Sequence, residues 1–243
     1  MIAFEYPLNE KIRSYLRFEF LFLQINETSQ FANHSDMTAF FKNLFDLLEL
    51  IERCDIRHDL IKDLRQLSGQ MKEWLSLDQV DHQAVSTMIA EIEELVINLS
   101  NMPKQLRYFK TNRFLTSLKQ RFSIPSGTCN FDLPQFHFWM NSELSQRQQD
   151  AQKWLSHFVN LDKALSLFLK MKRSQGVASD LIAQNGFYQG EVENCSFVII
   201  NVAKNQAVYP MISGHKNRYA IRFMNADIEN HRAENVSFQQ ICC

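Results

Sequence analysis

Residues 217–224 have the sequence NRYAIRFM, and the alternation of their side chains decides the fold class. A period of two places successive side chains on opposite faces of an extended chain. One face would carry Tyr219, Ile221 and Phe223, and the other Arg218, Ala220 and Arg222. This pattern predicts a β-strand with one buried face and one face in solvent.

Similar runs lie on both sides of this strand. Residues 195–202, 207–212 and 234–241 contain β-branched and aromatic residues without a helical period, so we expect three more strands. Ser213, Gly214, His215 and Lys216 lie between two of the four runs and suit a four-residue hairpin loop. We therefore expect a small antiparallel β domain over residues 181–243.

The first two thirds of the chain carry apolar residues at helical spacing. Pro7 and Asn9 precede the first helical segment, Asp36 suits the N-cap of the second, and Pro103 suits the first turn of the fifth. Residues 17–25 are apolar nearly all round, which predicts burial between neighbouring elements or at a subunit interface. The expected helices cover residues 9–25, 36–51, 60–75, 85–96, 103–122 and 144–172.

Residues 124–140 interrupt the helical pattern. Ile124, Pro125, Ser126 and Gly127 form a turn signature, and the following residues are rich in β-formers around Pro134. We expect short edge strands here, which join the C-terminal sheet. The predicted class is therefore α+β, with a mainly helical domain of about six helices over residues 1–180 and an antiparallel β domain over 181–243.

Composition limits the class of protein further. The chain has 243 residues, of which 45% are hydrophobic, enough to bury a sizeable core. We expect a soluble protein, because the N-terminus lacks the order of a secretory signal and no apolar run has the ~18 residues of a membrane helix. Five cysteines without CxxC spacing favour reduced thiols in a cytoplasm over a disulfide framework.

Charge is segregated along the chain, although the formal net charge is only −1. No acidic residue lies between Glu94 and Asp132, and we call the cations of that stretch the cation block. They are Lys104, Arg107, Lys110, Arg113, Lys119 and Arg121. The block predicts a docking surface for an anionic partner. The alternative is a solvated face, or pairing with the acid-rich residues 1–94, and it accounts best for Lys119 and Arg121.

A second basic group lies on the expected hairpin. Arg218 and Arg222 share one face of a strand, and the loop carries Lys216 to its tip. These cations suit the binding of a partner. They equally suit a charged sheet edge that prevents pairing with other chains.

Two further candidates lie elsewhere in the chain. Arg17 follows Arg13 by one helical turn, but only Arg13 has a good local partner, Glu10. His137 lies among aromatic residues, where a histidine is more often a satisfied core residue than a functional group.

Signatures of catalysis are missing from the sequence. It has no GxxxxGK[ST] or GxGxxG phosphate loop, no HExxH or GxSxG motif, and no Cys/His spacing of a zinc site. Because a fold can still bring distant residues together, missing motifs lower the odds of catalysis without excluding it. We expect a binding protein that is not an enzyme and that uses no metal or cofactor.

Several strings spread over the chain point to one family. They are PLNEKIRSYLRFEFL at residues 7–21, SIPSGTCNFDLPQFHFWM at 123–140, NGFYQ at 185–189, YPMISGHKNRYAIRF at 209–223 and the terminal pair of cysteines. Together they resemble the ZapD family, the Z-ring-associated proteins D. The resemblance covers nearly the whole chain, and its two longest internal strings are specific.

The resemblance implies a cytoplasmic cell-division factor at the midcell division ring. Members of the family are symmetric homodimers that bind the C-terminal tail of FtsZ, the tubulin-like division GTPase, and bundle its filaments. The family is not enzymatic, and its architecture of a helical and a β-strand domain agrees with the pattern above. The positions that match the family's basic residues are Arg17, Arg57, Arg121, His137, Lys216, Arg218 and Arg222.

We expect five of these residues to converge on one concave basic face between the two domains: Arg17, Arg121, His137, Arg218 and Arg222. Lys104, Lys110 and Lys119 lie outside the specific strings, so the resemblance gives them no role. The competing class is a nucleic-acid-binding module that uses the same basic clusters. It lacks a recognisable motif, and we expect neither a nucleic-acid nor a membrane partner.

Overall fold

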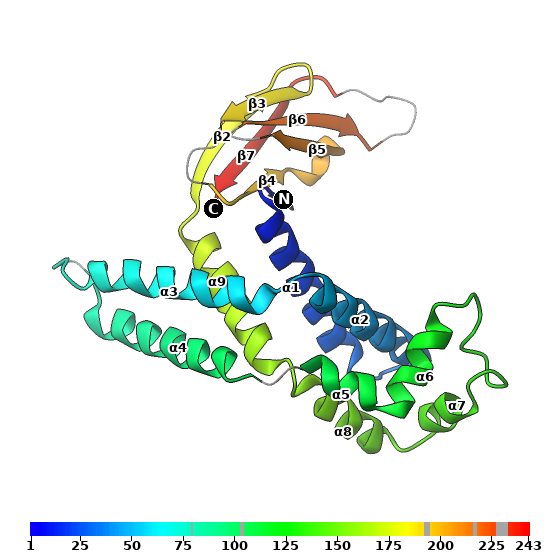
Figure 1. Cartoon of the computed structure of the whole chain (residues 1–243). Coiled ribbons are helices and arrows are strands. Elements are labelled where there is room, and N and C mark those ends of the chain that lie inside the picture. The colour runs from blue at the N-terminus through cyan, green and yellow to red at the C-terminus, as the bar shows by residue number, and fades with distance from the viewer. Residues whose placement is uncertain (79, 103–104, 192–194, 216–217, 227–232) are drawn as a thin grey trace. The chain divides into compact units, whose positions relative to one another are not determined.

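The protein has an α+β fold, as the sequence predicts (Figure 1). The computed structural model describes residues 1–78, 80–102, 105–191, 195–215, 218–226 and 233–243. The chain divides into two compact units. Met1–Leu16 and Leu169–Cys243 form the sheet unit, and Arg17–Phe168 forms the helical unit. The sheet unit therefore includes residues 1–16. The domain boundary expected after residue 180 would assign these residues to the helical domain.

The sheet unit contains two antiparallel sheets. One has the strand order β1-β4-β7-β2, and the other has the order β3-β6-β5. The bounds are β1 (Ile2–Pro7), β2 (Val177–Ala183), β3 (Phe187–Glu191), β4 (Phe197–Val202), β5 (Val208–His215), β6 (Arg218–Asn225) and β7 (Val236–Cys242), with a 3₁₀ helix η1 (Lys204–Gln206). All four expected strands are present, and β1 to β3 are strands that the sequence analysis did not predict.

The core of the sheet unit lies between the apolar faces of its strands. Tyr219, Ile221 and Phe223 of β6 are buried in it, together with residues of β2, β4 and β7. Arg218 and Arg222 are exposed on the opposite face, so the predicted alternation is confirmed. Burial raises the pKa of Tyr219 to about 12, because its hydroxyl is removed from water.

The expected hairpin loop is wrong in its bounds. Ser213, Gly214 and His215 belong to β5 and pair with β6, so the strands extend almost to the turn. Lys216 lies outside the residues that the structure describes. A different tight turn, between β2 and β3, has Asn185 and Gly186 at positive φ, as a two-residue hairpin turn requires.

The helical unit carries most of the helices. Their bounds are α1 (Glu10–Thr28), α2 (His34–Arg53), α3 (Ile56–Trp74), α4 (His82–Ser100), α5 (Gln105–Thr111), α6 (Arg113–Phe122), α7 (Pro134–Met140), α8 (Leu144–Leu155) and α9 (Val159–Ser174). Helices α1 and α9 each belong to both units. Helices α3 and α4 pack side by side (Figure 1), with an ion pair of 2.7 Å between Lys72 Nζ and Glu93 Oε1.

Local capping explains why the helix bounds differ from those expected. Asn112 caps α6 by accepting the Leu115 N–H at 3.1 Å, which breaks the segment expected as one helix over residues 103–122. Asn33, not Asp36, is the N-cap of α2, and Asp36 completes a capping box. The helix expected over residues 144–172 is divided into α8 and α9. Pro103 lies outside the described residues.

The edge strands expected within residues 124–140 are wrong. This segment consists of turns followed by helix α7, and the structure records no sheet pairing for it. Pro134 occupies the first turn of α7, where its missing N–H has no cost. Phe136, Trp139 and Met140 are buried at a spacing of three and four residues, which is a helical period that the aromatic composition concealed.

An aromatic cluster organises the helical unit around Phe41. Its ring lies 5.4 Å from Phe136, 5.2 Å from Trp139 and 5.4 Å from Trp154, measured between centroids. The buried Trp139 donates its indole N–H to Asp150 Oδ2 at 2.9 Å, so its polar atom is satisfied. The cluster joins α2, α7 and α8, and thereby fixes the position of the turns that follow α6.

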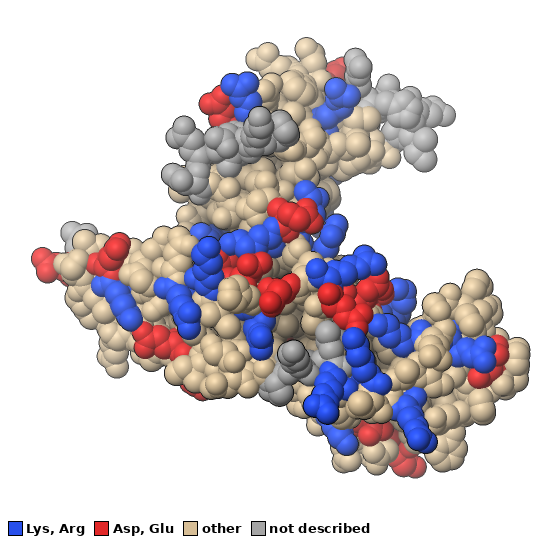
Figure 2. All heavy atoms as spheres, in the orientation of Figure 1, with Lys and Arg blue, Asp and Glu red and all other residues tan. Residues whose placement is uncertain are grey.

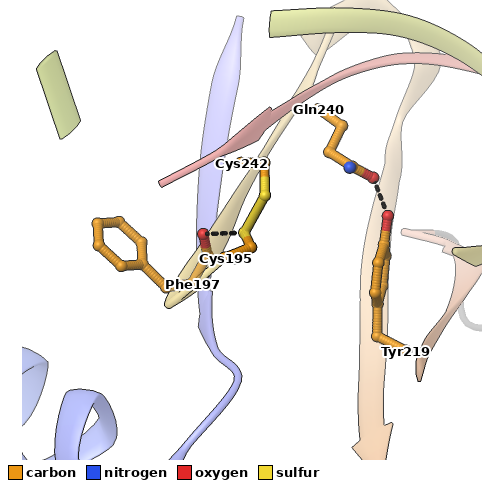
Figure 3. The surroundings of a disulfide bond; sticks show 5 residues. All are labelled: Cys195, Phe197, Tyr219, Gln240 and Cys242. Carbon is orange, nitrogen blue, oxygen red and sulfur yellow. Dashed lines mark hydrogen bonds between the residues drawn. A yellow bond between two sulfur atoms is a disulfide. The ribbon is translucent and has the colours of Figure 1, made fainter. Parts of the chain in front are cut away.

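The structure joins Cys195 and Cys242 in a disulfide, with 5.6 Å between their Cα atoms (Figure 3). The expectation of reduced thiols is therefore wrong for this pair, while Cys54, Cys129 and Cys243 are not disulfide-bonded. Figure 3 also shows the Tyr219 hydroxyl donating to Gln240 Oε1. Among the described residues, no helix is long and apolar enough to cross a membrane.

Candidate functional site

The outer face of the β3-β6-β5 sheet carries two of the candidate residues. Arg218 Nη2 lies 3.2 Å from Glu191 Oε1 on the neighbouring strand, in a pair that is largely exposed. Arg222 is exposed and forms no ion pair within the described part of the chain. It is therefore the cation of this face that is available to an external carboxylate. Lys216 cannot be placed beside them because it lies outside the described residues.

Arg121 lies in the last turn of helix α6, just before the turn that the SIPSG string forms. Its Nη1 atom lies 3.6 Å from Asp132 Oδ1, the acidic residue that closes the acid-free stretch. At that distance, with both side chains partly exposed, the pair contributes little to stability and leaves Arg121 able to exchange partners. Phe122, the next residue, packs against Phe41 and Phe136, which fixes the end of the helix.

His137 is exposed on α7, so the interpretation of it as a core residue is wrong. Its neighbour in the sequence, Phe138, is 78% exposed, and Phe131 before the helix is 79% exposed. Because the helical period turns Phe136 and Trp139 inward, it leaves His137 and Phe138 in solvent. The segment thus presents two exposed rings, and its Asp132 pairs with the cation Arg121.

Arg17 lies on α1 with its side chain exposed. In the residues that the structure describes, no carboxylate pairs with it. Arg13 behaves as expected, because its Nε atom lies 3.0 Å from Glu10 Oε2. The expected pairing of Arg13 with Glu10 is therefore confirmed.

The cation block is partly neutralised by an acidic residue of the first 94. Glu52 Oε1 lies 3.0 Å from Lys110 Nζ, and its Oε2 lies 3.9 Å from Lys119 Nζ. The hydrogen bond from Lys110 and the charge of Lys119 lower the pKa of Glu52, although its partial burial acts in the opposite direction. Pairing with residues 1–94, the alternative to a docking surface, is therefore confirmed for Lys119 and holds for Lys110 as well, whereas Arg121 pairs with Asp132. Lys104 lies outside the described residues.

Two arginines near this pair line a cavity of about 500 Å³ in the helical unit. Arg107 and Arg57 contribute to it together with Glu52 and Lys110. Arg57 has a structural role, because its Nη1 donates a hydrogen bond to the Met102 carbonyl oxygen at 3.0 Å. Figure 2 shows the same mixture over the visible face of the helical unit, where acidic side chains lie between the cations.

The candidate residues thus lie in two groups. Arg17, Arg121 and His137 belong to the helical unit, and Arg218 and Arg222 belong to the sheet unit. Their convergence on one face stays a prediction. Among the described residues, no group of three or more His, Cys, Asp or Glu side chains could hold a metal ion.

A comparison with known protein families defines the class of this protein. The family ZapD, described as a cell division protein, matches residues 16–222. The Cell division protein ZapD of Shewanella sp. (strain MR-4) is 40% identical over 243 residues, covering 100% of this chain and 98% of that protein. That of Aliivibrio salmonicida is 37% identical with the same coverage, and that of Vibrio cholerae (strain ATCC 39541) is 36% identical over 99% of this chain and 98% of its own length. The chain therefore belongs to the ZapD family of cell division proteins.

Sequence reasoning missed the apolar residues that surround the candidate cations. Phe187 and Met211 are both exposed on strands that flank β6. Phe187 follows the Asn185–Gly186 turn, a strong hairpin signal that would have placed it at the start of a strand, although the turn does not indicate the pairing of that strand with β6. No sequence pattern predicts the exposure of the Phe131 and Phe138 rings, because the sequence favours short strands in this segment and not a helix.

Proposed function

We propose that this protein is a cell-division factor that binds the C-terminal tail of FtsZ through a basic surface. As a homodimer at the midcell ring it would cross-link and bundle FtsZ filaments, without catalysis. One observation carries the proposal: a ZapD family member leaves cations such as Arg17 and Arg222 exposed, with no carboxylate partner among the described residues. Exposed, uncompensated cations are suited to steering and holding an acidic segment.

Two identical sites on one dimer are enough to bridge two filaments. Each tail contact can be weak, because the second contact on an already attached dimer is intramolecular and gains from a high effective concentration. We assign the tail site to Arg17, Arg121, His137, Lys216, Arg218 and Arg222. The weak Arg121–Asp132 pair supports this assignment, because an incoming carboxylate can replace Asp132 at little cost.

Charge reversal tests the tail site. We expect the double variant Arg121→Glu, Arg222→Glu to weaken tail binding by at least about tenfold and to abolish bundling, because repulsion replaces attraction in both groups. Co-sedimentation of FtsZ filaments, with and without the C-terminal tail, measures the effect. The control Lys62→Glu, Lys204→Glu changes the net charge equally on exposed positions of α3 and η1 and should bundle like the wild type. Unchanged bundling by the first variant, with an intact dimer, would contradict the site.

The proposed dimer interface involves α1. Four of residues 17–25 are buried within the subunit, but Phe20 is 60% exposed and Leu23 is 55% exposed, one helical turn apart. We expect Phe20→Ser, Leu23→Ser to yield the 28.6 kDa monomer in light scattering, to keep tail binding and to lose bundling. Ile97→Ser, at a 59% exposed position of α4, is the matched control and should stay dimeric.

Two outcomes separate the parts of this proposal. A double α1 variant that remains dimeric would place the interface elsewhere. A wild-type protein that is monomeric at micromolar concentration would contradict bridging by a dimer.

A further inference from the structure

The antiparallel register of the β3-β6-β5 sheet places Arg222 between two apolar residues. Phe187 of β3 and Met211 of β5 are both its direct cross-strand partners. Side chains of directly opposed residues lie on the same face, with Cβ atoms roughly 4.5–5.5 Å apart. Phe187, Arg222 and Met211 therefore form a continuous row across the sheet, which we call the Arg222 row.

The Arg222 row is not part of the core. The inner face of the same strands is buried through Tyr219, Ile221 and Phe223, so the row faces away from the packed side. Phe187 is 45% exposed and Met211 is 57% exposed. Tyr209, 42% exposed, lies two residues before Met211 on the same face of β5. Apolar side chains gathered around a cation in this way mark an interaction surface.

Charge selects the kind of partner. Arg218, at the other end of β6, is already paired with Glu191, while Arg222 has no carboxylate partner in the described part of the chain. A guanidinium donates two parallel hydrogen bonds to a carboxylate, and the apolar neighbours lower the local polarity and strengthen that contact. The same neighbours offer a surface to an apolar side chain next to the carboxylate in a bound segment.

We propose that the Arg222 row anchors a peptide segment in which an acidic residue lies next to an apolar one. The inference rests on the proposed function, since it identifies where the FtsZ tail would place its apolar side chain. A nucleic acid fits the row less well, because a phosphate chain requires a track of cations and Glu191 lies on the same face. A second copy of the chain fits less well too, since a stable dimer buries roughly 800 Å² per partner and the row is only three residues wide.

Removing the apolar side chains while keeping Arg222 tests the proposal. Phe187→Ser and Met211→Ser, made in the full-length protein, should each weaken binding of a fluorescein-labelled peptide of the FtsZ C-terminal tail by about tenfold in fluorescence anisotropy. Phe187→Leu, which keeps an apolar side chain, should bind within about threefold of the wild type. The matched control is Ile182→Ser, an apolar residue of β2 in the other sheet that is 62% exposed, and it should bind like the wild type.

The possible failures are distinguishable. If the wild type binds the peptide and both serine variants bind it equally well, the Arg222 row is not an anchor and the proposed function stands. If the wild type does not bind the peptide, the proposed function falls and takes this inference with it. Serine variants that lose binding to a labelled single-stranded oligonucleotide but keep the peptide would overturn the inference in favour of nucleic acid. Serine variants that turn a dimer into a monomer would overturn it in favour of a subunit interface.

Discussion

The Phe41→Ala variant is expected to lose about 3–5 kcal/mol of unfolding free energy, because it removes a fully buried ring from the middle of the aromatic cluster. The Phe41 ring makes edge contacts to the buried rings of Phe136 and Trp139, which lose these contacts when the ring is removed. Urea unfolding followed by tryptophan fluorescence measures the loss, since Trp139 and Trp154 both lie in this cluster.

A matched substitution provides the control for Phe41→Ala. Phe131→Ala removes the same atoms from a ring that is 79% exposed, and it should change the unfolding free energy by less than about 0.5 kcal/mol. A loss below about 1 kcal/mol in Phe41→Ala would show that the cluster does not hold the unit together. Because Phe41 packs against Phe122 and Phe136, we also expect this variant to weaken bundling, through the neighbouring residues Arg121 and His137.

The Gly190→Ala variant is expected to destabilise the sheet unit by about 2–4 kcal/mol. Gly190 of β3 is opposite Tyr219, and a Cβ atom there would lie 2.3 Å from the Tyr219 hydroxyl oxygen and 2.5 Å from Cζ. The ring is buried and its hydroxyl donates to Gln240, so it cannot move without breaking that hydrogen bond. Hydrogen exchange in β3 and β6 measures the loss of protection.

Gly69→Ala is the matched control for Gly190→Ala. A Cβ atom at Gly69 meets nothing within 4 Å, and the residue lies inside α3, where alanine is favoured over glycine. This variant should therefore be more stable than the wild type by about 0.5–1 kcal/mol. If Gly190→Ala keeps wild-type protection in β3 and β6, the close approach of Tyr219 does not restrict that position.

Local sequence patterns predict a helix or strand correctly where the residues of that element alone show which of its faces is buried. The alternation around Ile221 and the helical spacing before residue 100 both report a single buried face, so each could be recognised without knowledge of its neighbours. The segment 134–140 could not, because its aromatic residues suit a strand as well as a helix. Burial of Phe136 and Trp139 against Phe41 selected the helix.

Strand β1 shows a second reason why prediction failed. Ile2–Pro7 pairs with β4 almost two hundred residues away, and nothing in its own six residues indicates that partner. The free energy of such a strand comes from hydrogen bonds and packing across the sheet, which a local pattern does not contain.

The sequence by itself determined the fold class, the positions of most helices, the family and the segregation of charge, since these depend on residue type and spacing. Only the tertiary structure decided which cations remain available. Lys110 and Lys119 are paired with Glu52, whereas Arg222 is exposed in a row with Phe187 and Met211. The reason is physical: a charge's availability depends on which distant carboxylates the fold brings within a few ångströms of it, and spacing along the chain does not specify that distance.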